Sequence, residues 1–351
     1  MTSCTHFGIC GGCELQDLSA VEYAAHKKAA VETALAKAGV AVEVLAPIIV
    51  PPQTRRRAVF KIKSLAQGLH IGFHAARSHT VVDMHQCEVL TPGLFALVGA
   101  LRARLEAEFG VGEAAELHVT ETQTGFDCAF RWKRNLTPNL TAELSKTLSG
   151  IGIARLVMNG ETVFEIATPT VSLGGVPVAL PPDAFLQSTA EGEAALQARV
   201  AAITARAKTI ADLFAGCGTF TLPLARGARV HAVEQDAPAL AALAAAAKAP
   251  KLKPVTTEVR DLFRLPLTAL ELSRFDAVVL DPPRAGAQAQ AKMLAASKVQ
   301  TIAYVSCDAT SFARDAAILA GAGFTPGPVQ PVDQFLWSAH IELVAGFTRG
   351  R

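Results

Sequence analysis

The sequence contains no apolar run approaching the roughly 20 residues that a helix needs to cross a lipid bilayer. This holds although 50% of the 351 residues are hydrophobic and the mean hydropathy is +0.30, because the surplus consists mostly of alanine. The opening segment, MTSCTHFGIC, also lacks the basic stretch and apolar core of a secretory signal. We therefore expect a soluble, cytoplasmic protein with substantial cores and no membrane partner.

The chain also carries little net charge, +2 at pH 7, which excludes a protein that coats nucleic acid through general positive charge. Any polyanion must therefore bind a local patch. The best candidate is TRRRAVFKIK, in which no acidic residue interrupts Arg55, Arg56, Arg57, Lys61 and Lys63. A weaker candidate is RWKR at residues 131–134. Both runs are also compatible with strand edges that charge keeps from aggregating.

Internal repeats and low-complexity linkers are absent as well, and the residue pattern divides the chain into three parts. Residues 1–41 combine a cysteine-rich opening with a helix that begins after Ser19 and ends at Gly39. Residues 42–180 predict a central α+β domain with a hairpin over 68–84 and helices near 92–109 and 138–148. Residues 181–351 alternate helices with short apolar strands.

The strands of this last part are TIADLF, RVHAVE, FDAVVLD and TIAYVS, each followed by a helical stretch. Such alternation is typical of a doubly wound parallel sheet. We therefore predict an α/β fold with a Rossmann-like domain over 181–351. Ligands of such sheets bind at the carboxyl ends of the strands.

A glycine turn follows the first of these strands, in IADLFAGCGTFTLPLA. Gly216 and Gly218 let a ligand approach the backbone there. The dinucleotide fingerprint requires a third glycine where Thr221 stands, which disfavours a nicotinamide cofactor without excluding it.

Acidic residues follow the other strands. Glu234 is placed to accept hydrogen bonds from two ribose hydroxyls, and Asp261 can meet an adenine amino group. Asp281 begins a rigid Asp-Pro-Pro turn, because proline fixes its own φ and restrains its neighbour. Together these strand ends favour S-adenosylmethionine, although acidic caps and glycine turns occur in any α/β protein.

Arg284 follows the proline pair, where enzymes that methylate exocyclic amines commonly have an aromatic residue. This indicates methylation at carbon. Carbon 5 of uracil is too electron-poor to attack a sulfonium methyl group unless a thiolate first adds to carbon 6, and Cys307 can supply that thiolate. Glu342 can then remove the proton from carbon 5.

Alternatively, Cys307 is a small core residue and Glu342 is a solvated surface residue. The neighbouring Asp308 opposes a thiolate, so it must point away or be offset by Arg284 or another cation.

The chain resembles the RNA 5-methyluridine methyltransferases over nearly its whole length, through FLQST, DLFAGCGTF, LDPPRAG, YVSCDATSFARD and HIELV. The resemblance implies that Cys307 is the nucleophile and Glu342 the base. It further implies that Gln187 and Asp281 contact uracil or the cofactor, and that the cofactor pocket is lined by Phe214, Gly216, Glu234 and Asp261. The family usually has asparagine at the position of Asp308 and an aromatic residue at that of Leu186.

Seven cysteines in a reducing compartment indicate metal binding or catalysis rather than disulfides. Cys4, Cys10 and Cys13 have the spacing C-x5-C-x2-C, and Cys87 supplies a fourth thiolate, which suits either zinc or an iron–sulfur cluster. The pattern is similar to that of family members that act on large ribosomal RNA and carry a [4Fe-4S] cluster. The resemblance therefore implies this cluster and a 23S rRNA substrate, with Arg284 and the Arg55–Arg57 and Lys61 run contacting RNA.

Three functions remain open at this point. The first is methylation of 23S rRNA, either as naked RNA or in a ribosome assembly intermediate, and the second is methylation of transfer RNA. The third is an RNA-binding iron–sulfur or zinc protein whose methyltransferase fold is catalytically idle. The chain begins at the cysteines, so we expect it to lack the β-barrel RNA-binding domain of many relatives, and we expect a monomer.

Overall fold

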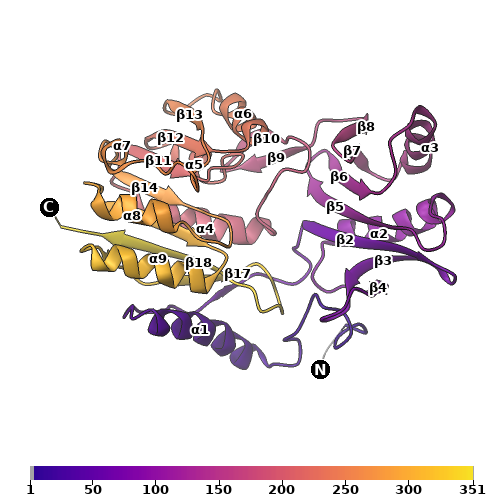
Figure 1. The fold of residues 1–351 in the computed structure, drawn as a ribbon, viewed down its shortest axis with the longest axis horizontal. Helices are drawn as coiled ribbons and strands as arrows, with labels where there is room; N and C mark the ends of the chain where they lie inside the picture. The colour runs from indigo at the N-terminus through magenta and orange to yellow at the C-terminus, as the bar shows by residue number, and fades with distance from the viewer. Residues whose placement is uncertain (1–3, 351) are drawn as a thin grey trace.

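The computed structural model describes residues 4–350. Within them, the strands form a nine-stranded sheet, a seven-stranded sheet and a two-stranded ribbon. Figure 1 shows the two large sheets side by side, with the ribbon between them and the N-terminal segment near the junction. No helix in the described part of the chain is long and apolar enough to cross a membrane.

The seven-stranded sheet has the order β4-β3-β2-β5-β6-β7-β8, and all neighbours are antiparallel except β6 and β7. Alternate residues of β2, including Phe60 and Ile62, point into a core that α2 and α3 cover. The elements are β2 (Arg57–Leu65), β3 (Gly68–His74), β4 (Val81–Asp83), α2 (Pro92–Leu105), η1 (Glu106–Glu108), β5 (Ala114–Thr122), β6 (Gly125–Trp132), α3 (Pro138–Leu148), β7 (Ile153–Met158) and β8 (Glu161–Glu165).

The nine-stranded sheet has the order β1-β17-β18-β15-β14-β11-β12-β13, with β16 paired to β18. Strands β11 to β15 are mutually parallel, and β18 enters antiparallel beside β15. The strands are β1 (Ile48–Ile49), β11 (Thr209–Leu213), β12 (Arg229–Glu234), β13 (Val255–Val259), β14 (Ala277–Leu280), β15 (Thr301–Ser306), β16 (Thr325–Pro326), β17 (Gln330–Asp333) and β18 (Glu342–Thr348). The ribbon consists of β9 (Thr170–Leu173) and β10 (Val176–Ala179).

Helices cover both faces of this sheet, which explains why β14 is buried along its whole length. They are α4 (Ala190–Ile203), α5 (Thr221–Leu224), α6 (Ala237–Ala246), α7 (Ala269–Leu272), α8 (Gln288–Ala296) and α9 (Ala309–Gly321). The predicted doubly wound α/β arrangement is thus confirmed. Because β11 lies between β12 and β14, the strand order reverses there, at the position where such sheets bind ligands.

Helix α1 (Ala20–Lys37) begins as predicted, with Ser19 accepting a hydrogen bond from Glu22 N and the Glu22 side chain closing the capping box. Its apolar residues Val31 and Leu35 belong to the core of the nine-stranded sheet. Strand β1, which the sequence places in the central region, also pairs with β17 of this sheet. The helices predicted near 92–109 and 138–148 and the β3–β4 hairpin are confirmed; α2 ends at Leu105 and continues as the 3₁₀ turn η1.

Candidate active site

The carboxyl edge of the nine-stranded sheet brings Cys307 and Glu342 together. Cys307 follows β15 directly, and Glu342 is the first residue of β18. Ser306 is paired with Leu343 in the antiparallel register, so the next residues outward on the two strands are Cys307 and Glu342. On its other side Glu342 is paired with Val332 of β17. Two residues 35 positions apart in sequence are thereby neighbours.

Glu342 is almost fully buried, and its Oε2 atom has no hydrogen-bond partner among residues 4–350. Burial raises the pKa of this carboxyl to about 7, while the Gln334 side chain and the Arg284 cation lower it. Such a group exchanges a proton readily near neutral pH, as a general base requires. The Oε2 atom is therefore a buried acceptor without a partner in the described part of the chain.

Asp281 follows β14 and lies beside this pair. Burial and the Glu342 and Asp212 carboxylates raise the pKa of Asp281, and the Gln187 amide, which donates to Oδ2 at 3.3 Å, lowers it. The carbonyl oxygen of that amide accepts from Gln334 Nε2 at 2.5 Å. The predicted residues Gln187 and Asp281 therefore belong to one polar chain with Glu342, which Gln334 completes.

Sequence reasoning missed Gln334. It follows β17 in VDQFLW and has no local signal of function, because only the pairing of β17 with β18 brings it near Glu342.

Cys307 is partly exposed and lines a surface groove between α1 and α9, with Lys37, Thr310 and His340 also on its walls. Burial and the carboxylates of Glu342 and Asp281 raise the pKa of the thiol to about 11, and Arg284 lowers it. The Asp308 carboxylate caps α9 by accepting from Ser311 N at 2.7 Å, which agrees with the expectation that it points away from the thiol.

Arg284 also faces the segment before β18. Its Nη2 atom lies 3.0 Å from Nε2 and 3.1 Å from Nδ1 of His340. Burial and the cations of Arg284, Lys27 and Arg55 lower the pKa of His340, so its ring is neutral near pH 7 and accepts from the guanidinium.

The predicted cofactor residues gather around the end of β11. Gly216 and Gly218 have φ of +53° and +101°, which only glycine adopts without strain. Glu234 accepts from Gly216 N at 3.0 Å and, through its other oxygen, from Gln235 N and Asp236 N at 2.7 and 2.9 Å. This carboxylate therefore joins the glycine turn to the end of β12.

Two further contacts in this region involve Thr221 and Asp261. The Thr221 hydroxyl, at the position of the missing third glycine, donates at 2.5 Å to Asp212, a buried carboxyl whose pKa burial raises to about 7. Asp261 Oδ1 accepts from Phe263 N at 2.9 Å, and the exposed Phe263 ring lies 5.5 Å from that of Phe214. Phe263 was missed by sequence reasoning, although an exposed aromatic residue directly after the acidic strand end is a recognisable signal.

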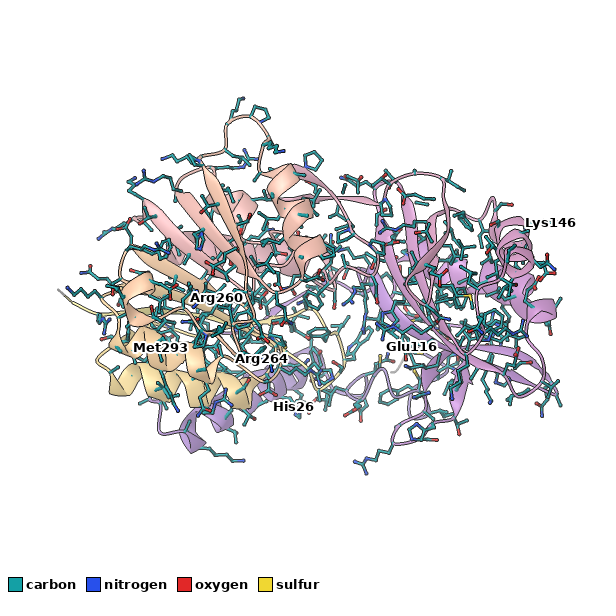
Figure 2. The ribbon with its side chains drawn as sticks, turned by 45° about the horizontal axis from the view of Figure 1, so that its top comes forward. His26, Glu116, Lys146, Arg260, Arg264 and Met293 are labelled. Carbon is teal, nitrogen blue, oxygen red and sulfur yellow. The ribbon has the colours of Figure 1, made fainter. Side chains whose placement is uncertain are left out.

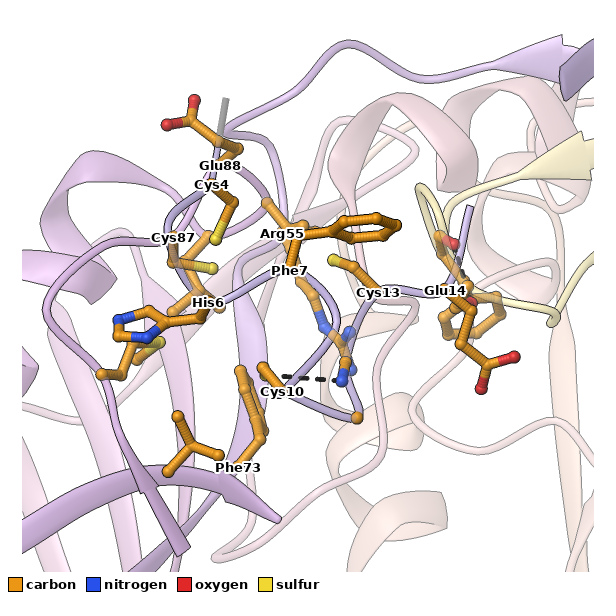
Figure 3. A pocket seen from close by; sticks show the side chains of 18 of the residues that line it. Cys4, His6, Phe7, Cys10, Cys13, Glu14, Arg55, Phe73, Cys87 and Glu88 are labelled. Carbon is orange, nitrogen blue, oxygen red and sulfur yellow. Dashed lines mark hydrogen bonds between the residues drawn. The ribbon is translucent and has the colours of Figure 1, made fainter. Parts of the chain in front are cut away.

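The four predicted metal ligands line one cavity of about 450 Å³ between the two sheets. Figure 3 shows Cys4, Cys10, Cys13 and Cys87 around this cavity, with Arg55 among them. Burial raises the pKa of the Cys10 and Cys87 thiols. For Cys13, burial together with the charge of Cys87 raises the pKa to about 12. However, no three or more His, Cys, Asp or Glu side chains within residues 4–350 are arranged to hold a metal ion. The metal centre therefore stays a prediction.

The two remaining cysteines, Cys128 and Cys217, are buried, as expected for packing residues.

The basic run is not the free cationic patch that its sequence suggests. Arg56 Nη2 donates to Glu193 at 2.7 Å, and Lys61 forms an ion pair with Glu116 on the paired strand β5. Figure 2 labels Glu116 on the seven-stranded sheet. Arg57 lies over the Phe185 ring, 5.0 Å from its centroid. Arg55 lines the cysteine cavity and its Nε donates to the Arg57 carbonyl at 3.0 Å. Acidic partners distant in sequence thus neutralise much of the run.

The fold is that of the Rossmann-like S-adenosylmethionine-dependent methyltransferases. The tRNA (uracil-54, C5)-methyltransferase of Pyrococcus abyssi, solved with S-adenosyl-L-homocysteine, superposes with a TM-score of 0.77 over 97% of this chain and 85% of its own, at 23% identity. A profile of the family described as tRNA (Uracil-5-)-methyltransferase matches residues 179–348.

Sequence relatives cover nearly the whole chain. An uncharacterised RNA methyltransferase of Rhizobium meliloti is 45% identical, over 97% of this chain and 84% of its own length. The 23S rRNA (uracil(1939)-C(5))-methyltransferase RlmD of Chromohalobacter salexigens is 33% identical, over 99% of this chain and 76% of its own length. The chain belongs to the RNA uracil-C5 methyltransferase family and is an S-adenosylmethionine-dependent enzyme.

Proposed function

We propose that this enzyme methylates carbon 5 of a uridine in 23S rRNA through a covalent adduct between Cys307 and carbon 6. The observation that carries the chemistry is the position of Cys307 beside a buried carboxyl, Glu342, with a free oxygen and a pKa of about 7. The choice of 23S rRNA is supported by the Chromohalobacter relative that is named for this activity.

In the proposed reaction the Cys307 thiolate adds to carbon 6, and the electron pair of the C5=C6 bond moves toward carbon 5 and the adjoining carbonyl. When bound, S-adenosylmethionine supplies the methyl group that the enriched carbon 5 accepts. The Glu342 carboxylate then takes the proton from carbon 5, the C5=C6 bond forms again, and the C6–S bond breaks to release the thiolate. Gln187 and Asp281 face the same space and are proposed to orient the uracil edge.

Glu234, Asp261 and Phe214 are the proposed cofactor contacts. Oε1 of Glu234 accepts two hydrogen bonds in the turn and Oε2 accepts one. Because each carboxylate oxygen accepts two hydrogen bonds, Oε2 keeps one lone pair for a ribose hydroxyl. The ring pair of the partly buried Phe214 and the exposed Phe263 offers apolar surface for an adenine ring.

We also propose that Cys4, Cys10, Cys13 and Cys87 hold a [4Fe-4S] cluster with a structural role. The proposal is supported by the chemistry of the donor set, because thiolates are the ligands of such clusters and four thiols from two distant segments line one cavity. Protein purified without oxygen is expected to be brown and to contain iron and sulfide. A colourless protein that contains zinc would contradict the cluster.

The substitution Cys307→Ala tests the function. Purified enzyme is incubated with labelled S-adenosylmethionine and either a 23S rRNA fragment or transfer RNA, and 5-methyluridine is measured by mass spectrometry. We expect the wild type to methylate rRNA and to form a stable adduct with RNA containing 5-fluorouridine, and Cys307→Ala to do neither. Cys128→Ala, which changes a buried packing cysteine outside the site, is the control.

Two results would contradict parts of this proposal. Methylation by Cys307→Ala would eliminate the covalent mechanism. Product in transfer RNA alone would favour the second candidate, which the family description and the Pyrococcus neighbour suggest.

A further inference from the structure

The segment of residues 334–341, here called the catalytic loop, connects β17 to β18. It begins with Gln334, the amide that bonds to Gln187, and it ends immediately before Glu342. His340, which faces Arg284, also belongs to it. The conformation of this loop therefore sets the position of three groups in the site.

Helix α1 holds the catalytic loop through a buried polar network. Lys27 Nζ donates to Asp333 Oδ1 at 2.9 Å and to the His340 carbonyl at 2.5 Å. The Tyr23 hydroxyl donates to Asp333 Oδ2 and accepts from Trp337 N at 2.7 Å. Tyr23, Lys27 and Asp333 are only 3%, 1% and 0% exposed.

The network contacts the loop at its beginning, middle and end. Asp333 Oδ1 accepts from Phe335 N at 3.2 Å, Tyr23 satisfies Trp337 N, and Lys27 satisfies the His340 carbonyl. The Trp337 carbonyl accepts from Glu14 N and Leu15 N of the cysteine segment at 2.7 and 3.0 Å. The loop is therefore held by chain from the opposite end of the sequence.

Stability alone does not account for such an arrangement. A buried ion pair is often no better for stability than well-packed apolar residues of the same volume, because both charges lose their hydration. Apolar replacements would leave Trp337 N and the His340 carbonyl without partners, and so would free the loop. What the network provides is a single conformation of the residues that precede Glu342.

We propose that Tyr23, Lys27 and Asp333 are positioning residues for Glu342, acting through the catalytic loop; this inference rests on the proposed role of Glu342 as the base. Their loss should impair proton removal from carbon 5 more than the earlier addition of Cys307. The covalent adduct between enzyme and ordinary RNA should then accumulate, because it forms normally and breaks down slowly.

The test compares Tyr23→Phe and the charge-free double variant Lys27→Met/Asp333→Asn with wild type. Rapid-quench single turnovers with unmodified RNA, followed by denaturing gels, give the rates at which the adduct forms and breaks down. The matched control is Arg155→Met/Asp127→Asn, which removes a buried bidentate pair in the other sheet, with N–O distances of 2.9 and 2.7 Å. Glu342→Gln defines the behaviour of an enzyme without its base.

We expect adduct breakdown to slow about tenfold in both network variants, with little change in adduct formation or in KM for RNA. The control should keep the wild-type ratio of the two rates even if it is less stable. If the ratio of adduct breakdown to adduct formation in Tyr23→Phe and in the double variant equals that of the control, the inference is overturned. If Glu342→Gln itself accumulates no adduct, the proposed role of Glu342 fails instead, which is a distinguishable result.

Discussion

The surroundings of Cys307, the proposed nucleophile, keep its thiol protonated. Two carboxylates and burial raise the pKa of its thiol to about 11, and only the Arg284 cation among the named charges lowers it. Because the thiolate is the reactive form, a proton must leave before the bond to carbon 6 is made. The cation of Arg284 favours that loss of the proton.

The substitution Arg284→Met should make Cys307 harder to ionise. Without the cation the pKa of the thiol rises further, so the rate of adduct formation with 5-fluorouridine RNA should reach a given value only at higher pH. The rate is measured from about pH 6 to pH 9 at saturating RNA. Arg274→Met is the control, because Arg274 precedes β14 and lies at the opposite edge of the sheet. An unshifted pH profile would show that Arg284 does not act on the thiol.

Glu342 should reduce stability above its usual pKa. The folded protein keeps the Glu342 proton up to about pH 7, whereas the unfolded chain releases it near pH 4.5, so stability falls as the pH rises between these values. Glu342→Gln removes this titration. We expect it to increase the free energy of unfolding by about 2 to 3 kcal/mol at about pH 8, and much less at about pH 4.

Urea denaturation at the two pH values measures this difference. Glu32→Gln, which changes an exposed glutamate on α1, should show no such pH dependence. Equal effects of Glu342→Gln at both pH values would mean that its carboxyl titrates normally in the folded protein.

At the scale of elements, helix α9 shapes the turn that carries Arg284. Asp315 of α9 is fully buried and accepts from the Tyr304 hydroxyl at 2.6 Å, from Ala287 N at 2.7 Å and from Arg314 Nε at 2.8 Å. Gly286 has φ of +73° and packs directly on these side chains. The turn after β14 is therefore fixed by a helix that follows the next strand.

Gly286→Ala should disturb this turn. An added Cβ would lie 2.6 Å from Arg314 Nη2 and 2.7 Å from Asp315 Oδ2, in a backbone conformation that alanine rarely adopts. We expect a loss of about 1 to 3 kcal/mol in stability and slower adduct formation, since Arg284 moves with the turn. Gly321→Ala is the control, because open space surrounds that helical position. Wild-type stability and rate in Gly286→Ala would exclude this role of the turn.

At the scale of the whole molecule, an early helix and the C-terminal strands come together near the active site. Helix α1 comes first in sequence but packs on the nine-stranded sheet with the C-terminal strands, as Figure 1 shows. The cysteine cavity is lined by residues from the opening segment, from the central region and from the catalytic loop. The cysteine segment contacts the loop directly through the Trp337 carbonyl.

S-adenosylmethionine should stabilise the enzyme against heat. A ligand present at about 100 times its Kd adds about 2.7 kcal/mol to the folded state, which raises Tm by several degrees. Glu234→Ala should lose this increase, because it removes the proposed ribose contact and the support of the glycine turn. Glu32→Ala is the exposed control. A full ligand-induced rise of Tm in Glu234→Ala, measured by differential scanning fluorimetry, would contradict the placement of the cofactor.

The local pattern of residues determined much of this protein. Alternating helices and apolar strands defined the parallel sheet, and Ser19 marked the start of α1. The polar residues at strand ends, Cys307 and Asp281 among them, were assigned to one edge of the sheet. These predictions succeed because hydrophobic periodicity, caps and turns depend on neighbours within a few residues.

Only the tertiary structure decided how distant segments combine. The antiparallel entry of β18 places Glu342 beside Cys307, and acidic residues of α4 and β5 neutralise Arg56 and Lys61. The docking of α1 against the catalytic loop, through Lys27, likewise has no local signature. The physical reason is that strand pairing and buried ion pairs join residues far apart in sequence, where no local propensity records the partner.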